Sequence, residues 1–342
     1  MRFQYPYSII RTIQGRGRHH KLGRRKTNHL TPGEETKAKV AILREIVKNK
    51  YLYVLALPGL LFLIVFAYIP MAGHLIAFKK YRLADGLWGS EWVGFDNFKF
   101  FFMSSDWYKV TFNTIFLNGL FIVCGLGIAL ILAIFLNEIR NLVFKKIAQS
   151  FIFMPYFISW LVVSMMVFAF LNTSDGILNR TLMSYGVEGE NWYLKPGLWP
   201  AILTIIYIWK FAGYFSIIFL AAITGISGDY YESARIDGAS RFQQIIHITI
   251  PLIRNVVIVL ALLGVGRIFY GDFGMIYGIV GDNAPLYPTT DVIDTYSFRA
   301  LRQLGDFSKS SAVILYQSVM GLITIVVFNA IAKKIDKDSS LF

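Results

Sequence analysis

The chain has 342 residues, of which 55% are apolar, and its mean hydropathy is +0.52. A soluble protein of this length alternates apolar and polar segments, whereas here several apolar runs reach the roughly 20 residues that cross a bilayer. The net charge of +13 would suit a nucleic-acid-binding protein, but the basic residues lie in tails and loops beside the apolar runs. Membrane topology explains that distribution better, so no nucleic-acid partner is expected. The composition predicts an all-α polytopic membrane protein.

Residues 1–50 form a basic tail followed by a helix. The tail has few apolar side chains to bury, and its charge predicts attraction to the anionic surface of a lipid bilayer. The sequence Thr31-Pro32-Gly33-Glu34 has the pattern of a helix start, with Thr31 as the cap and Pro32 in the first turn. We therefore expect a cytoplasmic helix from Thr31 through Lys50.

Six apolar runs are predicted to span the membrane as helices. They are residues 52–76, 111–136, 147–171, 199–225, 253–271 and 312–332. An even number of spans places both termini on one side. The segments on that side hold 22 of the 34 Lys and Arg residues, against 10 in the opposite loops. Because basic residues are retained inside, both termini are expected to lie in the cytoplasm.

The organisation that follows has four parts. Residues 1–50 are the cytoplasmic tail and helix, and residues 51–107 are the first span with an aromatic external loop. Residues 108–334 are the main transmembrane domain, and residues 335–342 are a cytoplasmic tail. The large external loop at 270–311 contains TTDVIDTYSFRAL (289–301), which predicts a short helix starting near Thr289 or Thr290.

The most informative stretch runs from Asp229 to Pro251, between two apolar runs. Its first part has good helix formers, and Gly238 then permits a turn that a residue with a Cβ would resist. A second short helix is expected from Ser240 to Ile248, closed by Pro251. A loop that only connected two spans could be far shorter. This charged helical pair is predicted to lie in the cytoplasm.

Motifs for catalysis are absent from the sequence. There is no Gly-Lys pair, so the phosphate-binding loop of an ATPase is missing, and HExxH, CxxC and GxSxG patterns do not occur. None of the five histidines has a metal-ligand spacing with a carboxylate on one helix face. We expect no catalytic residue, no metal and no cofactor on this chain.

The stretch resembles the EAA loop of the permease subunits of binding-protein-dependent ABC importers. That pattern is Glu-Ala-Ala, three residues, Gly, nine residues, then Ile-x-Leu-Pro. Here it reads Glu232-Ser233-Ala234, Gly238 and Ile248-Thr249-Ile250-Pro251, with every spacing kept. Ser233 and Ile250 are the departures, and both are small changes. The resemblance covers about residues 108–334, with the coupling loop at 229–251.

The resemblance implies a type I ABC importer permease fold of six transmembrane helices in a bacterial cell membrane, and it implies partners. These are a homologous second permease, an ABC ATPase dimer that holds ATP and Mg, and an extracytoplasmic solute-binding protein. The EAA helix would dock on the ATPase and drive alternating access. The residues implied in this coupling are Tyr231, Glu232, Ser233, Ala234, Asp237, Gly238, Ile248 and Pro251. The alternative for these residues is an interfacial helix with ordinary salt bridges.

The segment 266–301 resembles the LplB-like and YteP-like branch of this family, permeases for complex oligosaccharides that include aldouronates and pectin fragments. Within the fourth and fifth spans, charged and aromatic side chains are candidates for the substrate path. They are Tyr207, Trp209, Lys210, Tyr214, Arg267, Tyr270 and Asp272. Two cations would suit an acidic sugar such as a uronate. Alternatively, Arg267 pairs with Asp272 or a carbonyl, Lys210 snorkels outwards, and the aromatic residues only pack.

Two other functions stay open at this point. An ion-coupled secondary transporter would need acidic residues inside the spans, and Glu138 and Asp272 lie only at span ends. A membrane-embedded glycan-processing enzyme would need converging external carboxylates, which Asp272, Asp282, Asp291 and Asp294 could supply, although loop capping explains them better. A tightly bound ATPase would support the importer and exclude both alternatives.

Overall fold

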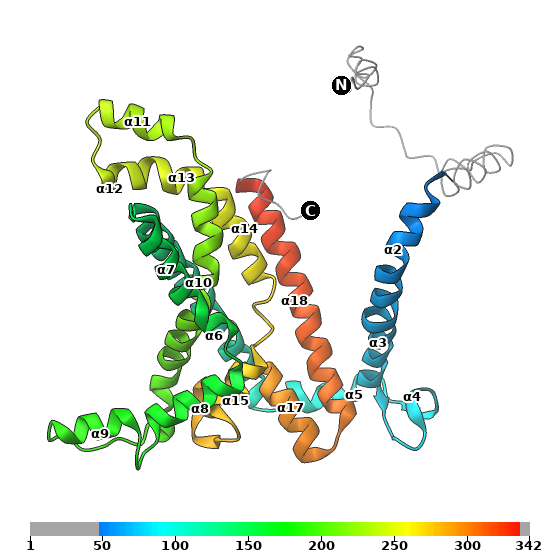
Figure 1. The fold of residues 1–342 in the computed structure, drawn as a ribbon. Helices are drawn as coiled ribbons and strands as arrows, with labels where there is room; N and C mark the ends of the chain where they lie inside the picture. The colour runs from blue at the N-terminus through cyan, green and yellow to red at the C-terminus, as the bar shows by residue number, and fades with distance from the viewer. Residues whose placement is uncertain (1–47, 336–342) are drawn as a thin grey trace. The chain divides into compact units, whose positions relative to one another are not determined.

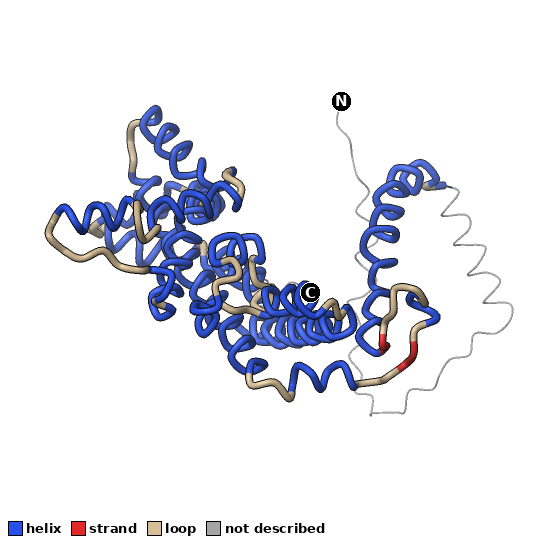
Figure 2. The backbone as a smooth tube through the Cα atoms, turned by 90° about the horizontal axis from the view of Figure 1, so that it is seen from below, coloured by secondary structure: helices blue, strands red, loops and turns tan. Residues whose placement is uncertain are grey.

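The computed structural model describes residues 48–335. Over that range the regular structure is helical except at residues 79–92, where a small hairpin forms (Figure 2). Its two-residue strands β1 (Lys79–Lys80) and β2 (Glu91–Trp92) pair antiparallel. The predicted all-α fold is confirmed, because this hairpin only closes a loop. Most of the predicted helix from Thr31 lies outside the described residues, as do residues 336–342 of the predicted C-terminal tail.

The chain divides into two units at Tyr68. The described part of the smaller unit consists of α2 (Lys50–Leu63) and the π-helical turn η1 (Ile64–Tyr68). None of their side chains is buried. An apolar helix without a buried face is typical of a span that contacts lipid or another subunit.

The larger unit begins at Ile69 and holds three long helices (Figure 1). These are α6 (Asp106–Glu138), α10 (Trp199–Thr224) and α18 (Phe307–Ile335). Two composite helices accompany them. The first consists of α7 (Leu142–Phe153), η3 (Met154–Phe157) and α8 (Trp160–Leu171). The second consists of α12 (Arg241–Gln244), η6 (Ile245–Thr249), α13 (Ile250–Leu252) and α14 (Arg254–Val265). The shorter elements are α3 (Ile69–Met71), η2 (Ala72–Phe78), α4 (Gly86–Gly89), α5 (Asp96–Phe102), α9 (Ile177–Ser184), η4 (Trp192–Leu194), η5 (Pro196–Leu198), α11 (Gly228–Ile236), α15 (Phe273–Val280), η7 (Ala284–Leu286), α16 (Tyr287–Thr290) and α17 (Ile293–Leu304).

Four stretches of the described residues are long and apolar enough to cross a membrane. They are Lys50–Phe78, Asp106–Glu138, Pro196–Thr224 and Phe307–Lys334. The third predicted span is a pair of helices that is bent by 97° after η3. In the fifth, only α14 is a helix: it is bent by 59° from α12 and α13, which belong to the predicted cytoplasmic loop, and it ends at Val265. All six predicted runs thus contain helices, but the third is broken and the fifth ends before residue 271.

The break in the third predicted span is held by a lysine from another helix. Pro155 in η3 has no amide hydrogen, and Ser159 starts α8 by accepting a hydrogen bond from its first turn. The carbonyls freed at such a break need donors, because no water is available inside a membrane. Lys210 of α10 provides them: its Nζ donates to the carbonyl oxygens of Pro155 (3.3 Å), Tyr156 (3.0 Å) and Ile158.

Lys210→Met is expected to destabilise the larger unit. Methionine fills similar space but leaves the carbonyls at the break without a donor, and each unsatisfied group away from water costs about 1–3 kcal/mol. The midpoint of thermal unfolding in detergent should fall by several degrees more than in Lys195→Met, which removes a half-exposed surface lysine. Equal midpoints for the two variants would contradict the assignment.

The spans approach one another closely along α10. A Cβ on Gly213 would lie 2.0 Å from the carbonyl oxygen of Ile152 in α7, and a Cβ on Gly125 in α6 would lie 2.9 Å from the Tyr207 ring. Small residues let membrane helices pack at short range. The two glycines therefore fix α10, with its aromatic side chains, against both neighbouring helices.

The predicted helix in the last external loop is present but starts later than predicted, at Ile293 instead of Thr289 or Thr290. The chain is extended at Asp291, and Thr295 accepts the Val292 amide at 3.0 Å. Asp291 also pairs bidentately with Arg299, at 2.9 and 2.5 Å, with both side chains largely buried. Two charge-assisted hydrogen bonds in parallel thus fix the loop against α17.

Candidate functional site

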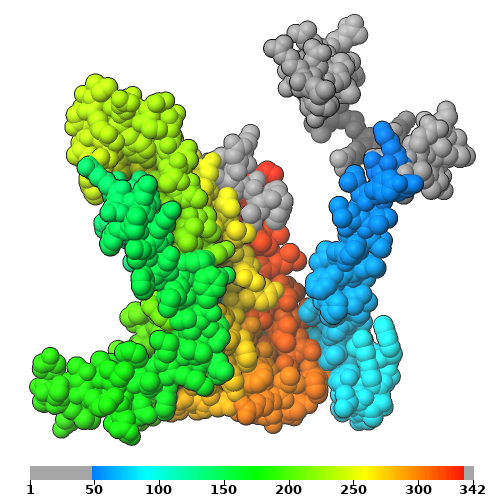
Figure 3. Space-filling view, viewed as in Figure 1, coloured from blue at the N-terminus to red at the C-terminus, as the bar shows by residue number. Residues whose placement is uncertain are grey.

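The predicted coupling loop is a helical hairpin at one end of α10, where it stands out as a lobe of the larger unit (Figures 1 and 3). Gly238 adopts φ +81°, and the amide of Ala239 donates to the carbonyl of Ala234 at 2.8 Å, which closes α11. Ser240 then starts α12 with a reciprocal capping box to Gln243. The two short helices and the glycine turn were predicted from sequence.

The second helix continues past the predicted stop at Pro251. It runs through α13 to Leu252, and the direction changes only at Ile253. A proline inside a helix cannot donate to the carbonyl four residues earlier. The π-helical turn η6 directly before it widens the helix at that point, so Pro251 is accommodated rather than terminating the helix.

The implied coupling residues fall into two groups by exposure. Glu232, Ser233, Asp237, Gly238 and Pro251 are exposed, whereas Tyr231, Ala234 and Ile248 are partly buried. The hydroxyl groups of Tyr231 and Thr249 are hydrogen-bonded at 2.9 Å, which ties α11 to η6. The exposed Glu232, Ser233 and Asp237 leave polar groups on the surface of the hairpin, while the hydrogen bond of Tyr231 holds its two helices together.

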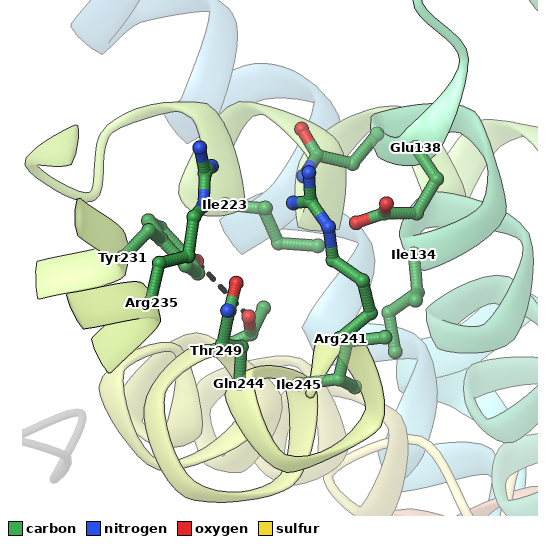
Figure 4. Close-up of a pocket in the computed structure, with 10 residues that line it drawn as sticks. Ile134, Glu138, Ile223, Tyr231, Arg235, Arg241, Gln244, Ile245 and Thr249 are labelled. Atoms are coloured by element: carbon green, nitrogen blue, oxygen red, sulfur yellow. Dashed lines mark hydrogen bonds between the residues drawn. The ribbon is translucent and has the colours of Figure 1, made fainter. Parts of the chain in front are cut away.

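A pocket of about 130 Å³ separates the hairpin from the ends of α6 and α10 (Figure 4). Arg235 and Arg241 line it from the hairpin, and Glu138 of α6 faces Arg241. Gln244 is 3% exposed, and its Oε1 has no hydrogen-bond partner among the described residues. The space between the hairpin and the spans is thus lined by charged and polar side chains together with isoleucines.

A much larger cavity, of about 890 Å³, lies between α6, α10, α14 and the segment after α14. Five of the seven residues predicted for the substrate path line it. They are Tyr207, Tyr214, Arg267, Tyr270 and Asp272. The structure therefore brings together side chains from two spans that lie about 60 residues apart in sequence. This cavity and the coupling hairpin are separate sites on the same helix, α10.

Arg267 is the cation of this cavity. It follows the end of α14 at Val265, is exposed, and forms no ion pair with any residue that the structure describes. The predicted alternative of a pair with Asp272 is not found among the described residues. Asp272 instead caps α15 by accepting from Met275 N (3.0 Å), and it accepts from Trp160 Nε1 (2.9 Å).

Lys210 and Trp209 are not among the residues that line the cavity. Lys210 is 5% exposed and bound to the three carbonyls of the break, and its ammonium group lies 5.0 Å from the Trp160 ring centre. It neither snorkels outwards nor reaches the cavity. Trp209 is 41% exposed on another face of α10.

Sequence reasoning missed several aromatic residues that line the cavity, among them Phe121, Tyr156, Phe215 and Phe273. Phe121 stacks on Tyr207 at 4.8 Å between ring centres, and Tyr156 stacks on Tyr214 at 4.6 Å. Phe121 is one of several phenylalanines in an apolar run and carries no distinguishing signal. Tyr156 does carry one, because it follows Pro155 in a span, where a break was foreseeable.

A family model and individual relatives place this chain in the same class of protein. Residues 125–337 match the family model described as binding-protein-dependent transport system inner membrane component. Protein LplB of Bacillus subtilis is 38% identical over 87% of this chain and 93% of its own length. The polygalacturonan/rhamnogalacturonan transport system permease protein YteP of the same organism is 35% identical over 87% of this chain and 92% of its own length.

A solved structure agrees with these relatives. It is the crystal structure of a bacterial ABC transporter involved in the import of the acidic polysaccharide alginate, with a TM-score of 0.79 and 31% identity over 86% of this chain and 99% of that one. A second structure of such a transporter, in complex with an alginate pentasaccharide-bound periplasmic protein, has a TM-score of 0.78 at 32% identity, over 86% of this chain and 98% of that one.

These findings define a membrane-spanning transport subunit with the type I ABC importer permease fold. The chain belongs to the family of binding-protein-dependent transport system inner membrane components. The predicted resemblance to LplB-like and YteP-like permeases is confirmed. Proteins of this kind are permease subunits and not enzymes, as predicted, and the chain is a multi-pass inner-membrane protein.

Proposed function

We propose that this permease imports an oligosaccharide that contains uronate residues, delivered by an extracytoplasmic binding protein and driven by a separate ABC ATPase. ATP and Mg would be held by that ATPase, and a homologous second permease would complete the pore. The secondary transporter and the glycan-processing enzyme, considered from the sequence, do not agree with the family of the chain.

The observation that carries the substrate class is the position of Arg267. Its guanidinium group lines the cavity without an ion-pair partner among the described residues. A guanidinium group binds carboxylates through two parallel hydrogen bonds. Asp272 adds a negative charge to the same cavity, but each of its oxygens already accepts a hydrogen bond. Arg267 is thus the group that remains available to an acidic sugar.

The aromatic wall supports a carbohydrate. Tyr207 and Tyr214 lie one above the other along α10, each backed by a stacked ring from a neighbouring element. Flat, fixed rings offer apolar faces to the C–H surface of a pyranose, and tyrosine hydroxyls can bond its hydroxyl groups. The substrates named for two relatives, polygalacturonan/rhamnogalacturonan for YteP and alginate for the structural neighbour, are also acidic.

The proposed orientation places the coupling hairpin and both termini in the cytoplasm. Within the larger unit, the end of α18 and the hairpin lie at the same end of the helices (Figure 1). This arrangement agrees with the excess of basic residues in the segments assigned to that side. The exposed Glu232 and Asp237 are then available to a polar groove on the ATPase.

The substrate class can be tested with two sugars of equal length. In proteoliposomes that contain the assembled importer, uptake of tetragalacturonate should exceed uptake of its methyl ester at least tenfold, because the ester lacks the charge that Arg267 binds. Arg267→Lys should keep part of this preference. Equal uptake of acid and ester by the parent complex would refute the acidic substrate but leave the importer function intact.

A further inference from the structure

The segment that carries Arg267 and Tyr270 is not a helix. α14 ends at Val265 and α15 starts at Phe273, so residues 266–272 cross the wall of the cavity as irregular backbone. Irregular backbone at membrane depth is tolerated only where its polar groups are satisfied by protein or lie in a watery cavity. The donors and acceptors used by this segment therefore decide where its side chains lie.

Some of these partners are backbone carbonyls: the amides of Arg267 and Ile268 donate to the end of α14, and the amide of Tyr270 donates to Arg267. Three side chains from three other helices supply further partners. Asn118 of α6 donates to the carbonyl of Ile268 at 3.0 Å. Gln317 of α18 donates to the carbonyl of Phe269 at 2.7 Å. Asp294 of α17 accepts the amide of Gly271 at 2.6 Å through its Oδ2. Consecutive parts of the segment are thus each held from a different direction.

Gln317 and Asp294 act as one unit. Gln317 is 3% exposed, and its Nε2 donates both to Phe269 and to the same Asp294 Oδ2, at 2.9 Å. A Cβ on Gly271 would lie 2.9 Å from that oxygen, so glycine permits the close approach. Burial raises the pKa of Asp294, while the hydrogen bonds from Gln317 and Gly271 oppose that shift. The carboxyl group is kept where water solvates it poorly.

We propose that Asp294 and Gln317 are positioning residues for the substrate path: they hold residues 267–271 so that Arg267 and Tyr270 face the cavity. Neither residue is among those that line the cavity. Their effect on transport therefore passes through the segment that they hold. The transport part of this inference rests on the proposed function, while the order of the segment does not.

Two substitutions at one position separate hydrogen bonding from packing. Asp294→Asn keeps an oxygen that can accept from both Gly271 and Gln317, whereas Asp294→Leu has a similar shape and no acceptor. Asp282→Asn is the matched control, because it removes an exposed external carboxylate whose ion pair is with Arg302, far along α17 from Asp294.

The first measurement is hydrogen–deuterium exchange of the assembled complex. Peptides that cover residues 266–272 should exchange at least tenfold faster in Asp294→Leu, and within twofold of the parent in Asp294→Asn and in Asp282→Asn. Unchanged exchange in Asp294→Leu would overturn the inference whatever the transport result. Faster exchange spread over all helices of Asp294→Leu would overturn it too, since this would indicate general unfolding.

The second measurement is uptake of tetragalacturonate by the same variants. Asp294→Leu should raise KM about tenfold with a smaller effect on kcat, and Asp294→Asn should restore KM to within about twofold. Added to Arg267→Ala, Asp294→Leu should have little further effect, because residues that act through one group are not additive. Full additivity, or faster exchange with an unchanged KM, would overturn the positioning role.

These results keep the two claims apart. If the parent complex does not transport tetragalacturonate, the proposed substrate fails, and the exchange data alone then decide whether Asp294 holds the segment. If Arg267→Ala transports normally while Asp294→Leu raises KM, Asp294 does not act on transport by positioning Arg267, and the inference is wrong on that point.

Discussion

Gly238→Arg is expected to abolish ATP-driven uptake while the spans stay folded. Gly238 adopts φ +81° at the tip of the coupling hairpin, a conformation that costs a residue with a Cβ about 1–2 kcal/mol. The new side chain would also add bulk and positive charge beside the exposed Asp237. We expect the ATPase subunit to be lost on purification and uptake to fall at least tenfold. Glu232→Lys, which reverses an exposed charge on α11, should act in the same direction.

Gly305→Arg is the matched control for this prediction. Gly305 adopts φ +63° after α17, has nothing within 4 Å of a Cβ, and lies at the other end of the larger unit. It thus carries the same backbone strain and the same added charge away from the hairpin. If both arginine variants lose the ATPase equally, the effect is one of folding and the docking role of the loop is contradicted.

Arg267→Ala is expected to lower uptake of the acidic oligosaccharide at least 30-fold while the complex still assembles. The variant removes the cavity's guanidinium group, which forms no ion pair with any described residue, so little of the fold depends on it. Losing a charged hydrogen-bonding partner of a substrate costs about 2–4 kcal/mol, or a 30- to 1000-fold loss of kcat/KM. Uptake by proteoliposomes and the thermal midpoint of the complex are the measurements.

Arg302→Ala is the corresponding control, because Arg302 is an exposed arginine that is paired with Asp282 and does not line the cavity. It should leave uptake within about twofold of the parent. Normal transport of the native sugar by Arg267→Ala would remove this residue from the substrate path, and a large fall in the midpoint would assign it a structural role instead.

The coupling hairpin was predictable because its signals are local. A run of helix formers, a glycine that takes positive φ, and Ser240 before a second short helix all lie within one stretch of chain. The spacing of Glu232, Gly238 and Pro251 then identified the family, which the comparisons confirm. The coupling roles of the individual residues stay predictions.

The role of Lys210 was not predictable from its surroundings in sequence. A lysine inside a span indicates a watery path or a special partner. Its partners are carbonyls more than 50 residues earlier, freed by a break whose 97° angle depends on how η3 and α8 pack. Only the presence of Pro155 hinted at this break.

The wall of the cavity was predictable in part, for a similar reason. Arg267 and Asp272 stood out as charges near an apolar run, and five of the seven candidates do line the cavity. The fifth span was predicted to reach residue 271, yet its helix ends at Val265. Apolar Ile268 and Phe269 extended the hydrophobic run, although Phe269 is buried in the protein core. Hydropathy cannot distinguish a lipid-facing helix from buried irregular chain.

The most direct test of ATP-driven import is to measure uptake when either ATP or an ion gradient is the only energy source. The assembled importer is placed in proteoliposomes with ATP and Mg inside and with the binding protein and labelled tetragalacturonate outside. We expect accumulation that requires internal ATP and is lost in Gly238→Arg. Accumulation driven by a proton or sodium gradient without ATP, by the permease alone, would contradict it.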